Sequence, residues 1–66
     1  MSVMKVIEIL SESDKSWEDA TRKAVRKASK SVNNIRSAWV QDQSVRVEDG
    51  EVKAYRVNLK ITFAVD

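Results

Sequence analysis

The chain has no cysteine, no histidine and no proline, and it has one glycine in 66 residues. Without cysteine it forms no disulfide and no thiolate metal site, and without histidine it lacks every catalytic arrangement that needs an imidazole base. A domain of this size buries only about 60% of its unfolded surface, so its stability is marginal unless something else supports it. Oligomerisation is the remaining route.

Long apolar runs and a strong charge surplus are also missing. No run approaches the roughly 18 residues of a membrane span, and the first ten residues, MSVMKVIEIL, interleave charges instead of forming a signal-peptide core. We therefore expect a soluble cytoplasmic protein with no membrane partner. The net charge of +2, from 12 basic and 10 acidic residues, is too small to hold nucleic acid at cellular salt by itself. With no repeat and no linker-like stretch, residues 1–66 are expected to form one domain.

Two segments have the composition of strands. Tyr55–Val65 alternates apolar and polar residues throughout, which predicts a long half-buried strand. Val3–Leu10 is rich in β-branched and aliphatic residues and predicts a first strand with apolar side chains on both faces. Together with a hairpin partner for the last strand, these make a sheet that is larger than one small subunit can cover.

A helix is predicted between the two strands. Ser11–Lys15 is a polar connection, and Ser16 is a suitable N-cap because acidic residues follow it in the first turn, where the helix dipole favours them. The apolar stripe, mostly alanine, predicts a helix from Trp17 to about Val32 that lies close against the concave side of a twisted sheet. Asn33 and Asn34 are expected to end it in a left-handed cap.

The remaining segment predicts a hairpin. Ile35–Val47 reads as the second strand, and Glu48–Glu51 contains the Asp-Gly pair typical of a two-residue turn. If Glu48 faces Glu51, the two strands pair in one register. The predicted pairs are Ser37 with Thr62, Ala38 with Ile61, Trp39 with Lys60, Val40 with Leu59, and Gln41 with Asn58.

This register creates one conflict. Asp42 would fall opposite Val57 on the apolar face, which predicts a bulge or a subunit boundary near Asp42–Ser44. The other face of the hairpin is polar except for Trp39. The overall expectation is an α+β fold.

The whole pattern resembles a known family. The order strand, helix, strand, strand, with KVIEIL near the start, SWEDA at the helix start and AYRVNLKITF at the end, resembles the dodecins across nearly the whole chain. The resemblance implies a β-α-β-β subunit whose three-stranded antiparallel sheet wraps partly around one helix. It also implies a homododecamer, a hollow sphere of twelve copies that binds or stores a small ligand without chemistry.

The usual ligand of the family is a flavin, bound between subunits. A tryptophan early in the second strand stacks on the flavin ring, and a glutamine after the tyrosine of the last strand bonds to its polar edge; Ser37 and Arg56 stand at these positions here. Trp39 shares a strand face with Ser37 and offers a displaced stacking surface, while Arg56 and Gln41 offer polar contacts. The resemblance therefore implies FMN, riboflavin or FAD as ligand. The candidate binding residues are Ser37, Trp39, Gln41 and Arg56.

Two alternatives to flavin binding remain open. Trp39 could fill a contact between subunits, and Arg56 could pair across that contact with Asp42 or Glu48, because tryptophan and arginine are both enriched in protein interfaces. SWED and NNIRSA also resemble a branch of the dodecins that lacks the flavin residues and is associated with calcium. No EF-hand pattern is present, so carboxylates could bind calcium only if symmetry brings copies together. The candidate acids are Glu18, Asp19, Asp42, Glu48, Asp49 and Glu51, and no metal site is predicted within one chain.

The helix offers a further alternative. Arg22, Arg26 and Lys30 follow one another at four-residue spacing, as do Lys23 and Lys27, and such a ridge could bind nucleic acid. No aromatic residue interleaves with it, which favours a solvated face over a nucleic-acid partner. No arrangement of nucleophile, base and orienting group is recognisable, so we expect no catalytic residue and no enzyme.

Overall fold

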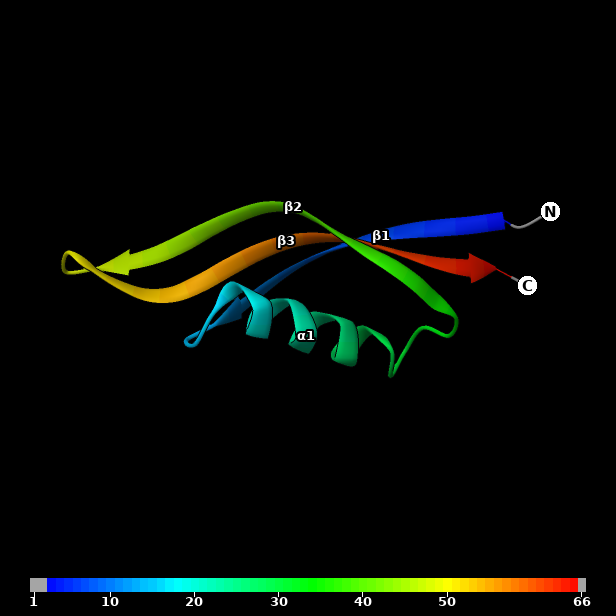
Figure 1. Cartoon of the computed structure of the whole chain (residues 1–66), viewed down its shortest axis with the longest axis horizontal. Coiled ribbons are helices and arrows are strands. Elements are labelled where there is room, and N and C mark those ends of the chain that lie inside the picture. Colours follow the sequence, from blue (N-terminus) through cyan, green and yellow to red (C-terminus); the bar gives the residue numbers. More distant parts are fainter. Residues whose placement is uncertain (1–2, 66) are drawn as a thin grey trace.

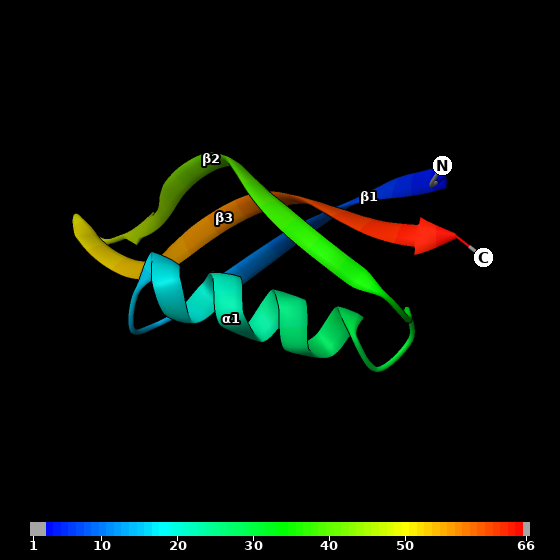
Figure 2. The ribbon, with the colours of Figure 1, turned by 45° about the vertical axis from the view of Figure 1, so that its right-hand side comes forward.

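Three strands and one helix make up the part of the chain that the structure, a computed structural model, describes, residues 3–65 (Figure 1). The strands form one antiparallel sheet in the order β1-β3-β2. The helix lies against one face, and the sheet curves partly around it (Figures 1 and 2). The predicted α+β, β-α-β-β fold is confirmed. The elements are β1 (Val3–Ser13), α1 (Trp17–Ala28), β2 (Ile35–Glu48) and β3 (Glu51–Val65).

The start of α1 follows the predicted capping chemistry. Ser16 is the N-cap, and its hydroxyl accepts a hydrogen bond of 3.0 Å from the backbone N–H of Asp19. Within residues 3–65, α1 is neither long enough nor apolar enough to cross a membrane.

The helix α1 ends earlier in the sequence than predicted. The helix stops at Ala28 instead of Val32, because the Ser29 hydroxyl donates to the Arg26 carbonyl at 2.8 Å and the next residues continue as tight turns. Asn34 is left-handed as expected, with φ of 64°, but it leads into β2 and does not cap the helix.

The first strand is longer than predicted. Ser11–Ser13 belongs to β1 and not to the connection, because α1 satisfies the two serine hydroxyls. Ser11 Oγ donates to the Ala20 carbonyl at 2.9 Å, and Ser13 Oγ donates to Asp19 Oδ2 at 2.5 Å. These bonds fasten the end of β1 to the first turns of the helix.

The core is small. Ala20, Ala24 and Ala28 of α1 are buried against the centre of β3, and the short alanine side chains let the helix approach the sheet closely. The largest side chains that are fully buried are Val57, Leu59 and Ile61. Residues such as Ile7 and Ile9 are only half-buried at the edge of this core.

The predicted β2–β3 register is confirmed from Ser37 to Val40 and again at Glu48. Trp39 lies opposite Lys60 and Glu48 opposite Glu51, but the predicted pairing of Gln41 with Asn58 is wrong. Gln41 is the extra residue of a bulge, and Asp42 takes the place opposite Asn58. The bulge lies one position before Asp42–Ser44, where the sequence predicted it. The bulge removes the predicted conflict, because it turns the Asp42 carboxylate to the face away from the helix.

The hairpin reaches well past the helix. Its turn has positive φ at both central residues, 53° at Asp49 and 77° at Gly50, as a type I′ turn requires. The turn end extends beyond the N-terminal end of α1 (Figure 1). The radius of gyration of 13.5 Å exceeds the roughly 11 Å expected of a compact 66-residue domain. One copy therefore leaves much of its sheet uncovered.

Truncating the centre of β3 should therefore be costly. Leu59→Ala removes one of the three largest buried side chains, so we expect the free energy of unfolding to fall by about 2 to 5 kcal/mol. Thermal unfolding at one fixed protein concentration measures this loss. Thr62→Ala, on the opposite face of the same strand, is the control, and an equal loss in both variants would contradict the placement of the core.

Candidate functional site

The candidate residues lie on the outer face, by which we mean the face of the sheet opposite α1. Val57, Leu59 and Ile61 point toward the helix, so the residues between them on β3 point outward. The register of both neighbouring strands then gives the outer face row by row. Its rows are Val6–Thr62–Ser37, Glu8–Lys60–Trp39, Leu10–Asn58–Asp42 and Glu12–Arg56–Ser44.

Trp39 is the most prominent residue of the outer face. Its side chain is 66% exposed, and the Lys60 Nζ lies 5.8 Å from the centroid of its ring. This distance is typical of a cation–π contact, which holds the ring near the sheet without burying it. Ser37 lies on the same face, opposite Thr62. The structure thus places Ser37 and Trp39 side by side, as the sequence predicted.

Arg56 lies apart from these two residues. It is four positions along β3 from Lys60, which is roughly 13 Å at the rise of a strand. Its Nε donates to Glu12 Oε1 at 2.5 Å, across the β1–β3 pair. Gln41 sits in the bulge of β2. Within one chain the four candidate binding residues therefore do not form one pocket.

The Arg56 contact belongs to a chain of four charges. Glu12 Oε1 also lies 3.5 Å from Arg46 Nε, and Arg46 Nη1 is 3.0 Å from Glu48 Oε2. The hydrogen bond from Arg56, and the charges of both arginines, hold the pKa of Glu12 below its ordinary value of 4.5. Sequence reasoning missed Glu12; the pairing of β1 with β3 would have revealed it, since it sets Glu12 directly opposite Arg56.

The candidate calcium ligands divide into engaged and free carboxylates. Asp19 accepts a hydrogen bond from Ser13 and pairs with Lys23 at 3.0 Å, and these contacts lower its pKa. Glu48 pairs with Arg46. Asp42 is exposed beside Asn58 and makes no ion pair within residues 3–65. Across those residues no three side chains of the metal-binding types gather at one place.

The basic ridge is exposed, as its pattern predicted, although Lys30 lies beyond the end of α1. Of its five cations, Lys23 is the one with an ion pair in the described part of the chain. Trp17 is not available to a nucleic acid base, because its ring packs edge-on against Tyr55 at 5.1 Å and its Nε1 donates to the Ser44 carbonyl. The ridge therefore offers charge without a stacking surface.

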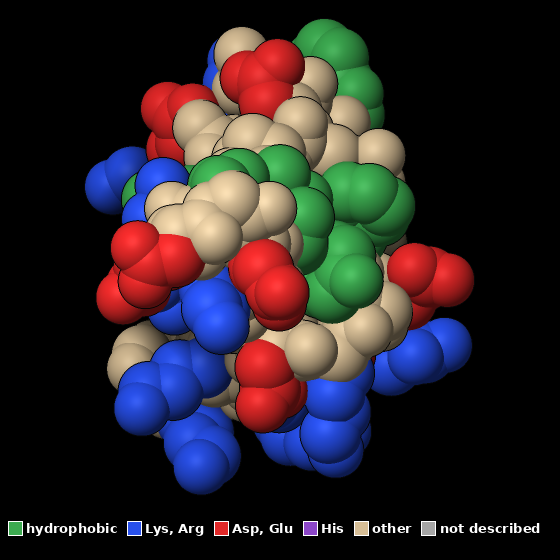
Figure 3. Space-filling view, turned by 90° about the vertical axis from the view of Figure 1, so that its left-hand side faces the viewer, with side chains coloured by type: hydrophobic (Ala, Val, Ile, Leu, Met, Phe, Trp, Pro, Cys, Tyr) green, Lys and Arg blue, Asp and Glu red, His purple; other side chains and the backbone are tan. Residues whose placement is uncertain are grey.

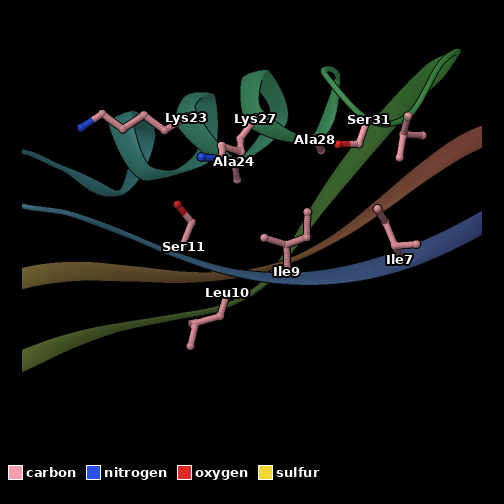
Figure 4. Close-up of a pocket in the computed structure, with 10 residues that line it drawn as sticks. Ile7, Ile9, Leu10, Ser11, Lys23, Ala24, Lys27, Ala28 and Ser31 are labelled. Carbon is pink, nitrogen blue, oxygen red and sulfur yellow. The ribbon is translucent and has the colours of Figure 1, made fainter.

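A groove that the sequence did not predict lies between α1 and β1 (Figure 4). Its volume is about 430 Å³, and Ile7, Ile9, Ala24 and Ala28 give it an apolar lining. The alanines that bring the helix close to β3 are too short to fill the space beside β1. Lys23 and Lys27 also line it.

Comparison with known proteins gives consistent results. The dodecin family model matches residues 3–66. Calcium dodecin of Mycobacterium tuberculosis is 43% identical over 63 residues, which cover 96% of this chain and 89% of that protein.

Solved structures agree. A crystal structure from the same species, of a calcium-chelating immunodominant antigen, calcium dodecin, with a novel calcium-binding site, matches with a TM-score of 0.86 at 41% identity, covering 98% of this chain and 93% of that one. A dodecin from Streptomyces coelicolor matches with a TM-score of 0.93 at 28% identity, again over 98% and 93% of the two chains.

The lowered pKa of Glu12 predicts a pH dependence. Because the folded-state pKa lies below the ordinary 4.5, the ionised carboxylate stabilises the fold fully above that pH, and this contribution is lost as the pH falls through the folded-state pKa. Glu12→Gln should therefore have a lower melting temperature than the wild type near neutral pH. The difference should close as the pH falls below 4.5. Melting curves across this range test it, with Glu8→Gln on the same strand face as control; a difference that is independent of pH would rule out the contribution.

Proposed function

The chain belongs to the dodecin family, and we propose that it is a non-enzymatic binding and storage protein that assembles into a homododecamer and holds calcium between its copies. The dodecin resemblance and the likeness to calcium dodecin that the sequence predicted are confirmed. Calcium, the twelvefold assembly and the storage role are the proposal. A flavin remains the second candidate ligand.

Self-assembly is supported by the balance of buried and exposed apolar surface. Among residues 3–65 the core contains three large side chains that are fully buried, whereas Met4, Val6, Leu10 and Trp39 leave 47%, 54%, 62% and 66% of their surface exposed on the outer face. Several large apolar side chains exposed on one face of a marginally stable subunit are typical of an interface. Covering that face with other copies adds the burial that the small core lacks.

The calcium proposal rests on the position of Asp42. The Gln41 bulge brings its carboxylate to the outer face, beside Asn58 and without an ion pair among residues 3–65. Calcium takes six to eight oxygen ligands, which one carboxylate and one amide cannot supply. One chain alone does not fit the ion, so the remaining oxygens must come from other copies that meet at this face. The 43% identity to a protein named calcium dodecin supports this choice of ion.

The flavin proposal rests on Trp39. Its open ring beside Ser37 and Thr62 could stack on an isoalloxazine, and a copy of the same ring across a symmetry axis could cover the other side. Two features weaken this proposal. Ser37 provides no stacking plane, and Arg56 is already bonded to Glu12. FMN, riboflavin and FAD therefore rank below calcium.

Asp42→Asn tests the calcium site. The wild-type melting temperature should rise with calcium, since a ligand that binds only the folded assembly at one hundred times its Kd stabilises it by about 2.7 kcal/mol. Asp42→Asn should lose most of this rise while keeping its melting temperature without calcium. Asp49→Asn is the matched control, because asparagine is also favoured at this left-handed turn position. A wild type that does not respond to calcium, or an equal loss in the control, would overturn the assignment to Asp42.

Riboflavin fluorescence tests the second candidate. If Trp39 stacks on the flavin, the wild-type protein quenches the fluorescence, and Trp39→Ala weakens binding by about 1 to 3 kcal/mol. Asp49→Asn, at the hairpin turn far from Trp39, should bind as the wild type does. Riboflavin fluorescence that stays unquenched in excess wild-type protein would contradict flavin binding at Trp39.

A further inference from the structure

Positive charge is concentrated in one segment of the chain. Residues 20–41 contain six of the twelve basic residues and none of the ten acidic ones, so the rest of the chain, with six basic and ten acidic residues, is negative overall. Five of the six cations form the basic ridge, which consists of Arg22, Lys23, Arg26, Lys27 and Lys30. The small net charge of +2 is therefore the sum of a strongly basic segment and an otherwise acidic subunit.

The basic ridge points away from the sheet. Ala20, Ala24 and Ala28 of the same helix face β3, and all five cations of the ridge are exposed. Figure 3 shows Lys and Arg side chains gathered at the lower side of the molecule, which is the side of α1 in Figure 1. The ridge thus lies on the side of the subunit opposite the outer face, where copies are proposed to meet.

Most of the ridge is not neutralised by the helix itself. The two carboxylates of α1, Glu18 and Asp19, both lie in its first turn, and Asp19 pairs with Lys23 at 3.0 Å. The other four cations of the ridge make no ion pair within residues 3–65. Five cations against two carboxylates leave three positive charges on this side.

The carboxylates of the other elements lie on other sides of the subunit. Those of the outer face are Glu8, Glu12 and Asp42, those of the hairpin turn are Glu48, Asp49 and Glu51, and Asp14 precedes α1 beside Lys15. The hairpin turn extends beyond the N-terminal end of the helix (Figure 1). Charges more than about 8 Å apart are largely screened at physiological ionic strength. A ligand at the ridge therefore interacts with the ridge and not with the net charge of the chain.

We propose that the basic ridge binds the phosphate backbone of double-stranded nucleic acid. Arg22 and Lys27 are separated by roughly 8 Å along the axis of α1. The same length of duplex carries about four to five phosphate charges, which matches the four ridge cations within the helix. The guanidinium groups of Arg22 and Arg26 can each donate two hydrogen bonds to a phosphate. Backbone contacts carry no sequence information, so we expect binding without sequence preference.

The lack of a stacking surface favours a duplex over a single strand. Proteins that bind single strands stack the bases on aromatic side chains, whereas a duplex keeps its bases stacked inside and presents phosphates. The ring of Trp17 is already packed against Tyr55. The missing aromatic residue, which favoured a solvated face in the sequence, therefore argues against a single strand but not against a duplex.

A lipid surface fits the ridge less well. A helix that lies in a bilayer interface inserts its apolar face. In α1 that face is buried against β3, and Val25, the one other apolar residue between Arg22 and Lys27 besides Ala24, packs against the same core. No apolar group between these two positions is left to insert, so attraction to a bilayer would depend on charge alone.

Several copies of the ridge strengthen the proposed contact. A few phosphate contacts by one ridge give weak, salt-sensitive binding. In the proposed homododecamer every copy carries the same ridge on the side away from the joined faces, so a duplex that touches two ridges gains avidity without any new contact. This gain rests on the proposed assembly, whereas the charge of each ridge does not.

Fluorescence anisotropy with a labelled DNA duplex tests the ridge. For the wild type we expect log K to fall with log salt at a slope of about −3 to −4 per ridge in contact. Lys27→Gln combined with Lys30→Gln should reduce the magnitude of this slope by about 2 and weaken binding roughly tenfold or more at about 0.1 M salt. Lys5→Gln combined with Lys53→Gln is the matched control, because it removes the same charge outside residues 20–41. The control should bind nearly as the wild type does.

Other outcomes of the titration would overturn the proposal. Equal weakening in the control, or no duplex binding by the wild type at about 50 mM salt, would show that the ridge is not the site. Tighter binding to single-stranded DNA of the same length would contradict the choice of a duplex. Binding only to vesicles of equal parts phosphatidylserine and phosphatidylcholine would assign the ridge to a membrane instead.

Native mass spectrometry of the same samples keeps this test separate from the proposed function. A wild-type assembly of twelve copies that does not bind the duplex overturns the ridge proposal alone. A monomer whose duplex binding depends on Lys27 and Lys30 supports the ridge and overturns the proposed assembly.

Discussion

The close packing of an alanine stripe on β3 determines most of this structure. Ala20, Ala24 and Ala28 allow α1 to lie deep in the curve of the sheet, against Val57, Leu59 and Ile61. The same small side chains limit the volume of the core and leave a groove beside β1. A helix of 12 residues cannot cover strands of up to 15 residues. The outer face and the turn end of the β2–β3 hairpin therefore stay uncovered by the helix.

The bulge at Gln41 connects the fold to the proposed binding function. Without it, Asp42 would lie opposite Val57 on the helix side of the sheet. With it, the carboxylate reaches the outer face and Gln43 takes the position opposite Val57. The bulge thus places the Asp42 carboxylate, which has no ion pair among residues 3–65, on the face where copies are proposed to meet.

Local signals in the sequence predicted the elements but not the contacts between them. The alternation from Tyr55 to Val65, the Ser16 cap and the Asp-Gly turn each depend on neighbouring residues, and all three are present in the structure. The end of β1 was missed because the serines there bond to the helix, which no local pattern records. The sequence predicted Arg56 as a polar contact of a flavin or, alternatively, as an ion-pair partner across a subunit contact; its partner within the chain, Glu12, is 44 residues away in sequence.

The central claim is that the subunit depends on its copies to bury enough apolar surface to stay folded. Sedimentation equilibrium combined with circular dichroism, on one sample diluted in steps, tests it most directly. The claim predicts a species near twelve times the 7.5 kDa mass of the chain, whose helical signal is lost as it dissociates. A monomer that keeps the full helical signal on dilution would contradict it.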